Sequence, residues 1–145
     1  MKIFVDADGC PVVKICADIS LKYGKECIIV SDTSHTFNIE GAHCVTVSKG
    51  SDSVDFYIAN AVGKGDIAVT QDYGLAAMCL TRGGRVLTQN ALIIDSSNID
   101  SLLMSRYSAQ KVRRAGGRTK GPSPRKPEQD KAFLEALKNL LNASQ

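Results

Sequence analysis

Short apolar runs alternate with segments of helical periodicity along most of this chain, and this alternation limits the fold more than any other feature. The strand-like runs lie near residues 3–5, 27–30, 44–47, 66–70 and 85–88, with a shorter one at 92–94. Between them, apolar residues recur every three or four positions, as in helices that bury one face. The alternation predicts right-handed βαβ units and a mainly parallel sheet. We therefore expect a three-layer α/β/α protein with about five strands.

The chain of 145 residues is long enough to bury one core. We expect an α/β domain over residues 1–110, a basic Gly- and Pro-rich loop over 111–127, and a terminal helix over 128–145. That helix begins near Pro127 and carries an apolar stripe, formed by Phe133, Leu134, Leu137, Leu140 and Leu141. Docking of the stripe on the core of the same domain is favoured over a surface for a partner helix.

Charge is divided unevenly along the chain. Residues 106–145 carry ten Lys and Arg against three Asp and Glu, whereas residues 1–105 carry eight against twelve. A basic segment of this kind can contact the phosphates of a nucleic acid, although a solvated surface is the simpler interpretation. The candidate phosphate contacts are Arg113, Arg114, Arg118, Lys120, Arg125 and Lys126.

Several classes of protein are disfavoured. The apolar runs are shorter than the roughly 20 residues of a membrane span, and no secretory signal follows Met1, so we expect a cytoplasmic protein without a membrane partner. The five widely spaced cysteines contain no C-x-x-C pair and are read as mostly buried, reduced thiols. Neither a dinucleotide-binding glycine pattern nor a P-loop is present.

The stretch from Ile3 to Pro11 contains the first candidate site. Asp6 falls at the carboxyl end of the first predicted strand, and Asp8 follows before the chain turns at Gly9 and Pro11 into a helix that should end at Gly24. Ligands of open α/β sheets bind at this edge. The alternative for Asp8 is that it caps the following helix.

Further carboxylates are predicted at the same edge. Asp72 follows the fourth strand, and Asp52 and Asp55 occupy the first turn of a helix that begins at Ser51 or Asp52. Asp66 begins a strand, so we expect it at the opposite edge with a structural role. His35, in the loop predicted over 31–41, is either a ligand or, as is more usual for a lone histidine in a loop, solvated.

Clustered carboxylates repel one another, by roughly 4 kcal/mol for two charges about 4 Å apart at an effective dielectric constant of 20. Some of them must keep a proton or share a cation. Oxygen ligands without His or Cys suit Mg²⁺ or Mn²⁺, which could hold a phosphodiester for attack by water. The simpler alternative is that each Asp separately caps a helix or a turn.

The pattern resembles the YaiI/YqxD family of bacterial proteins, whose activity is uncharacterised. The matching segments lie at residues 5–11, 50–55, 65–76 and 116–122. The fold of that family resembles the PIN nuclease domain, in which acidic residues at strand ends bind divalent metal and cut RNA or DNA. By this likeness Asp6, Asp55 and Asp72 would be catalytic metal ligands, with Asp8 and Asp52 as neighbouring acids.

Three functions are therefore expected to compete. The first is a nuclease dependent on Mg²⁺ or Mn²⁺ and acting on RNA or DNA, with RNA the favoured partner. The second is a phosphatase of the haloacid-dehalogenase type, because Asp6-Ala7-Asp8 resembles the opening motif in which the first Asp is the nucleophile. That class inserts a flap after the motif, so a hairpin between residues 9 and 15 would identify it. The third is a non-catalytic RNA-binding module.

Overall fold

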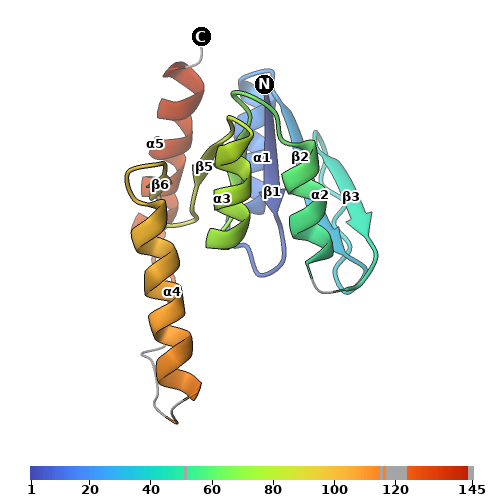
Figure 1. Ribbon diagram of the computed structural model, residues 1–145. Coiled ribbons are helices and arrows are strands. Elements are labelled where there is room, and N and C mark those ends of the chain that lie inside the picture. The colour runs from blue at the N-terminus through green and yellow to red at the C-terminus, as the bar shows by residue number, and fades with distance from the viewer. Residues whose placement is uncertain (51, 115, 117–123, 144–145) are drawn as a thin grey trace.

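A sheet of six strands lies between two layers of helices in the part of the chain that the computed structural model describes, residues 1–50, 52–114, 116 and 124–143 (Figure 1). Of residues 107–114 only the backbone is described. The strands are β1 (Lys2–Asp6), β2 (Glu26–Asp32), β3 (His43–Val47), β4 (Ile67–Val69), β5 (Arg85–Leu87) and β6 (Ile93–Ile94). The helices are α1 (Val13–Lys22), α2 (Ser53–Ala61), α3 (Tyr73–Thr81), α4 (Ile99–Arg114) and α5 (Pro127–Ala143). The expected three-layer α/β/α architecture is confirmed.

The strands run in the order β3-β2-β1-β4-β5-β6. All neighbouring pairs are parallel except β5 and β6, which are antiparallel. The sixth strand is the short run expected near residues 92–94. Because β1 lies between β2 and β4 and is parallel to both, its last residue, Asp6, lies beside the carboxyl ends of both strands.

Successive residues of β1 supply the two layers of the core. Ile3 and Val5 pack with α1 and α5 on one face of the sheet, whereas Phe4 packs with α2 and α3 on the other. All three side chains are buried. Because β1 has a covered surface on both sides, its sequence is an uninterrupted apolar run rather than an alternating one.

The last helix, α5, belongs to this core. Phe133, Leu137 and Leu141 are fully buried in the layer that also contains α1. The guanidinium of Arg85, on β5, donates a 2.9 Å hydrogen bond to the carbonyl of Leu140. The apolar stripe therefore docks on the domain's own core, as expected.

Two helix starts differ from the sequence-based expectation. Residues 11–12 form a turn, so α1 begins at Val13 rather than at Pro11. The stretch Ser97-Asn98-Ile99-Asp100 has the spacing of a capping box, but the Ser97 hydroxyl donates to the carboxylate of Asp95 instead of capping α4. Asp95 stabilises this turn, and its carbonyl accepts the N–H of Ile99.

Two elements are longer than expected. The strand β2 continues through Ser31 to Asp32, two residues that were assigned to a loop. Helix α4 extends to Arg114, into the segment expected to be a basic loop from residue 111 onward. No helix among the described residues has the length and apolarity needed to cross a membrane. All five cysteine thiols are free.

Candidate functional site

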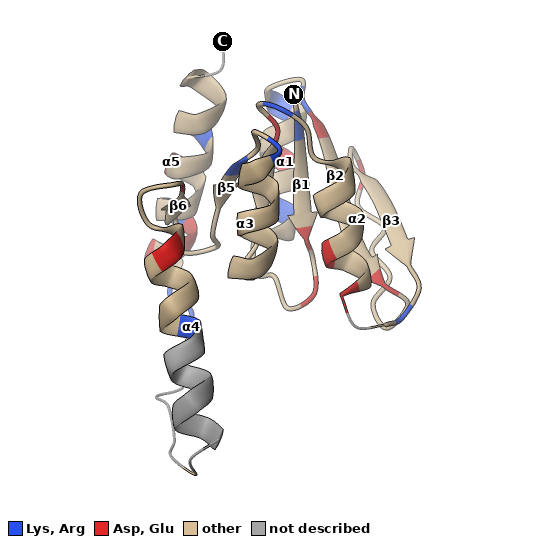
Figure 2. Ribbon diagram, in the orientation of Figure 1, with Lys and Arg blue, Asp and Glu red and all other residues tan. Residues whose placement is uncertain are grey.

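Acidic residues gather at the edge of the sheet where β1, β2 and β4 end (Figure 2). Asp6 and Asp32 are the last residues of β1 and β2, Asp72 is the N-cap of α3 after β4, and Asp55 lies in the first turn of α2. Asp66 is at the opposite edge, where its carboxylate accepts the N–H groups of Lys2 and Gly63, each at 2.9 Å. Its structural role is as expected.

Asp6 is held by a neighbouring strand. Its Oδ2 accepts a 2.8 Å hydrogen bond from the hydroxyl of Thr70, which follows β4. Burial raises the pKa of Asp6, and the charges of Asp72 and Asp8 add to that effect, while the Thr70 hydrogen bond partly offsets it. The Asp6 carboxylate therefore lies in a partly dry, negatively charged environment that favours a proton or a cation.

Asp72 is constrained on two sides. Its Oδ1 accepts the Leu75 N–H at 3.1 Å, which caps α3, and lies 3.2 Å from the Arg106 guanidinium nitrogen Nη1. Burial alone would raise the pKa of Asp72, but these two partners and a hydrogen bond with Asp55 outweigh it, and the pKa is lowered. Asp72 is therefore the ionised member of its pair.

Asp55 is the acid of this edge whose pKa is shifted strongly. Its pKa is raised to about 7, first by burial and then by the charge of Asp72 and their shared hydrogen bond, with smaller effects from Asp6 and Asp52. A carboxyl beside a carboxylate holds a proton near neutral pH when no cation neutralises the pair. Asp52 is exposed at the N-cap position of α2, where its side chain makes no capping hydrogen bond. Ser51, the other expected cap, lies outside the described residues.

Two hollows open beside these carboxylates, each of about 210 Å³. Asp6, Asp8 and Cys10 line the first, together with Thr70, Gln71 and Gln89. The second is lined by Asp52, Asp55, Phe56, Asp72, Met78 and Arg106, among others. Thr70 connects them, because its hydroxyl oxygen bonds Asp6 and also accepts the N–H of Asp72 at 3.0 Å.

Asp8 does not cap α1, whose N-cap residue is Val12 and which has no side-chain capping bond. Its Oδ1 lies 3.4 Å from Nδ1 of His35 instead. The sequence leaves His35 as either a ligand or, more usually, a solvated residue, and it does not predict this pairing with Asp8. Asp32 was also missed, because the apolar run ends at Val30 and the polar residues Ser31 and Asp32 have the composition of a loop.

The donors at this edge are suited to a hard divalent cation. Asp6, Asp55 and Asp72 offer carboxylate oxygens, and the pKa values of Asp6 and Asp55 are raised first by burial and then by neighbouring negative charge, which a cation would neutralise. Their ligand atoms do not all lie within 4.8 Å of one another, so they would have to draw together around one ion. Among the described residues, that spacing is met by Asp8, Asp32 and His35.

The basic residues expected to contact phosphates fall into three groups. Arg125 is engaged within the protein, since its guanidinium donates to Asp130 at 2.7 Å, Asn90 at 3.1 Å and the Gln89 carbonyl at 2.9 Å. Lys126 is exposed. The side chains of Arg113 and Arg114, on α4, and all of Arg118 and Lys120 lie outside the described residues.

Arg106 is a basic residue that sequence reasoning missed. It reaches Asp72 from α4, 34 positions later in the chain, and lies in the second hollow. A solvated arginine in the third turn of a helix carries no sequence signal of such a role.

The phosphatase alternative is contradicted. Residues 9–15 are all described: turns up to residue 12 lead into α1, which begins at Val13, and no hairpin is formed. The flap that this class places after its first Asp is therefore missing from its expected position. A nucleophilic role for Asp6 loses its structural support.

Comparison with known proteins identifies the family of this chain. Residues 4–143 match the family described as "Uncharacterized BCR, YaiI/YqxD family". A UPF0178 protein of Exiguobacterium sibiricum is 50% identical over 141 residues, covering 97% of this chain and 96% of the relative. A UPF0178 protein of Ruminiclostridium cellulolyticum is 51% identical over 137 residues, covering 94% of this chain and 90% of the relative.

A solved structure supports the fold. The crystal structure of Rae1 (YacP) from Bacillus subtilis is similar over 99% of both chains, with a TM-score of 0.50 and 14% sequence identity. At that identity the likeness concerns the fold, and it confirms the PIN-like architecture. With a family match across nearly its whole length, the chain belongs to the YaiI/YqxD family.

Proposed function

We propose that this protein is a divalent-metal-dependent nuclease that cleaves RNA or DNA phosphodiesters at the edge formed by Asp6, Asp55 and Asp72. The observation that carries the proposal is the raised pKa of Asp55, about 7, which arises from burial beside Asp72 with further charge from Asp6. Perturbed carboxyls in a hollow are typical of functional sites. The PIN-like fold is consistent with this chemistry but does not by itself establish it.

Mg²⁺ or Mn²⁺ bound at these carboxylates would supply a Lewis acid for the phosphate oxygens and would lower the pKa of water. The protein's own groups have separate roles. Thr70 orients Asp6 through its 2.8 Å hydrogen bond, and the Leu75 N–H orients Asp72. Asp55, which holds a proton near neutral pH while no cation is bound, would release it on binding the ion. Phosphate contacts would come from the basic residues, among which Lys126 is exposed.

The experiment uses the full chain with end-labelled single-stranded RNA and DNA, in Mg²⁺, in Mn²⁺ and in chelator. We expect cleavage that requires metal and that falls at least 100-fold in Asp6→Asn, Asp55→Asn and Asp72→Asn. Asp18→Asn, which removes an exposed carboxylate of α1, is the matched control and should cleave within twofold of wild type. Equal cleavage in the three variants, or none in wild type over a broad panel of single- and double-stranded substrates, would overturn the proposal.

A non-catalytic nucleic-acid-binding module is the second candidate. The ion pair of Arg106 with Asp72 favours it, because an internal cation already neutralises part of the acidic edge. In that case binding would need no metal. Its affinity would fall with salt, with a logarithmic slope of about −0.7 for each phosphate neutralised on a single strand, and no product would form.

The protein is proposed to act in the cytoplasm, where reduced thiols persist. The five free cysteines are consistent with that compartment. Labelling with a thiol reagent in intact and lysed cells would test it, since a cytoplasmic protein reacts only with membrane-permeant reagents before lysis. Labelling of intact cells by an impermeant reagent would contradict it.

A further inference from the structure

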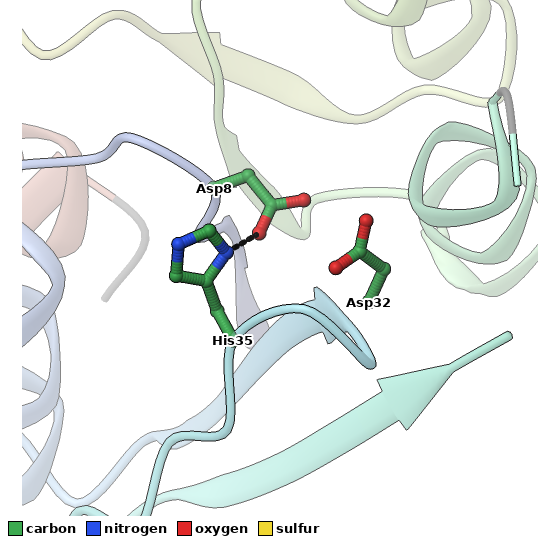
Figure 3. A group of neighbouring side chains, drawn as sticks. All are labelled: Asp8, Asp32 and His35. Carbon is green, nitrogen blue, oxygen red and sulfur yellow. Dashed lines mark ion pairs between the residues drawn. The ribbon is translucent and has the colours of Figure 1, made fainter. Parts of the chain in front are cut away.

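Three potential metal ligands from two segments, the loop after β1 and the end of β2 with its following turn, converge beside the carboxylate edge. Asp8 lies in the loop after β1, Asp32 ends β2, and His35 follows in the next turn (Figure 3). Each offers one ligand atom, and the three atoms lie within 4.8 Å of one another. In Figure 3 the imidazole and the two carboxylates point toward a common space.

The sheet and the turn bring these side chains together. Strands β1 and β2 are parallel neighbours, with Asp6 opposite Val30, and the Ala7 N–H extends their pairing by donating to the Val30 carbonyl at 3.0 Å. This places Asp8 close to Asp32. The chain then folds back, because the His35 N–H donates to the Asp32 carbonyl at 3.2 Å and the Ser31 hydroxyl donates to the His35 carbonyl at 2.8 Å.

The spacing of the donors suits one metal ion. Nitrogen and oxygen ligands lie about 2.0–2.2 Å from Zn²⁺, so two donors on one ion are at most about 4.4 Å apart. The 3.4 Å between His35 Nδ1 and Asp8 Oδ1 falls within that limit. It also exceeds the usual 2.7–3.2 Å of an N–H···O hydrogen bond, so the pair is close without being well bonded. Small side-chain rotations would bring all three ligand atoms within bonding distance of one ion.

The chemistry of the donors indicates which ions would bind. An imidazole nitrogen with two carboxylates suits Zn²⁺, Mn²⁺ or Fe²⁺, whereas Mg²⁺ prefers oxygen ligands alone. The side chain of His35 is 64% exposed and that of Asp8 is 36% exposed. The remaining coordination positions would therefore face solvent and take water or an anionic group.

We propose that Asp8, Asp32 and His35 form a binding site for one divalent transition-metal ion. Asp8 lines the hollow that also contains Asp6, whereas Asp55 and Asp72 line the other one. It shares no ligand with the trio Asp6, Asp55 and Asp72, so it goes beyond the proposed nuclease function and does not depend on it. Asp8, the neighbouring acid of that function, is here an ion ligand in its own right.

The test is a Zn²⁺ titration of the full, ¹⁵N-labelled chain after removal of metal by chelation, followed through the imidazole nitrogen signals. The chain has two histidines, and His43 is an internal control. Its Nε2 lies 3.5 Å from a carboxylate oxygen of Glu26 and its side chain is 71% exposed, so it resembles His35 except that no second carboxylate joins it among the described residues.

We expect one equivalent of Zn²⁺ to shift the His35 ring signals and leave those of His43 in place, with Mg²⁺ at the same concentration shifting neither. Asp32→Asn, which keeps the shape and the hydrogen bond to the Ser34 N–H, should weaken the Zn²⁺ affinity at least tenfold. His35→Gln should abolish the saturable site while the His43 signals report that the chain is folded.

The Asp55→Asn variant separates this proposal from the nuclease. It should lose cleavage and yet show the His35 shift at wild-type affinity. Equal shifts of both histidines, no shift at millimolar Zn²⁺, or a wild-type affinity in Asp32→Asn would each overturn the site. Failure of cleavage alone would leave the His35 result standing.

Discussion

The hydroxyl of Thr70 donates a 2.8 Å hydrogen bond to Oδ2 of Asp6, across the pairing of β1 with β4. The two residues are 64 positions apart. The same oxygen accepts the N–H of Asp72 at 3.0 Å, and Thr70 is only 3% exposed. The buried Thr70 side chain thus connects two acidic residues, Asp6 at the end of β1 and Asp72 after β4.

Replacing Thr70 with Val removes this connection at nearly constant volume. The Asp72 N–H and the Asp6 carboxylate each lose a partner in a partly buried place, so we expect the free energy of unfolding to fall by about 1–3 kcal/mol. The pKa of Asp6 should rise further, because the Thr70 hydrogen bond lowers it. Urea unfolding and a carboxyl-carbon NMR titration would measure both effects. Thr70→Ser keeps the hydroxyl, and if it were no more stable than Thr70→Val, the hydrogen bond would have no such role.

The raised pKa of Asp55 predicts a stability that falls as pH rises. The unfolded chain loses this proton near pH 3.8 and the folded chain near pH 7. The stabilisation that comes from this proton is therefore fully present below pH 3.8 and is lost as the pH rises to about 7. In Asp55→Asn the free energy of unfolding, relative to wild type, should increase over this interval by about 1 kcal/mol, a reduced value for a half-exposed group. Denaturation at several pH values in chelator would measure it.

Asp72→Asn should change the pH dependence of the free energy of unfolding in the opposite direction. The folded-state pKa of Asp72 is lowered, so its contribution is present above pH 3.8 and lost as pH falls below that value. The difference in the free energy of unfolding between Asp72→Asn and wild type should therefore shrink below pH 3.8, and not between pH 3.8 and about 7, where Asp55 titrates. Identical pH profiles for the two variants would show that the charge assignment within the pair is wrong.

Arg106 competes with any cation that binds at Asp72. Its Nη1 lies 3.2 Å from Asp72 Oδ1 in a solvated ion pair. Two charges at about 4 Å in water attract by about 1 kcal/mol, so Arg106→Gln should tighten Mn²⁺ binding by about fivefold. Calorimetric titration would measure it, with Lys131→Gln, an exposed position of α5, as the charge-matched control. An unchanged or weaker affinity in Arg106→Gln would contradict the competition.

Helix α5 should be required for folding. Phe133 is fully buried, so Phe133→Ala should lower the free energy of unfolding by about 3–5 kcal/mol. Phe56, which is 57% exposed on α2, is the matched control, and Phe56→Ala should change stability by no more than about 0.5 kcal/mol. Urea unfolding of both variants measures the contrast. Similar stability losses would contradict the separate core and surface positions of the two rings.

The positions of Asp6 and Asp72 could be predicted from the sequence because Asp6 directly follows an apolar run and Asp72 lies just beyond the apolar run of residues 67–69. Asp32 could not be, because β2 continues beyond its apolar residues. Ser31 and Asp32 are strand residues only because they pair with Thr46 and Val47 of β3. Pairing between distant segments overrides the local polar composition.

The sequence by itself determined that Asp6 ends a strand and that Asp72 follows one, since burial on both faces of a parallel sheet requires continuous apolar runs and these acids come just after such runs. Only the tertiary structure decided which acids are neighbours. The strand order places β1 between β2 and β4, so Asp6 and Asp8 lie between Asp32 with His35 on one side and Asp72 on the other. Strand order and register arise from packing of the whole sheet, and no local pattern records them.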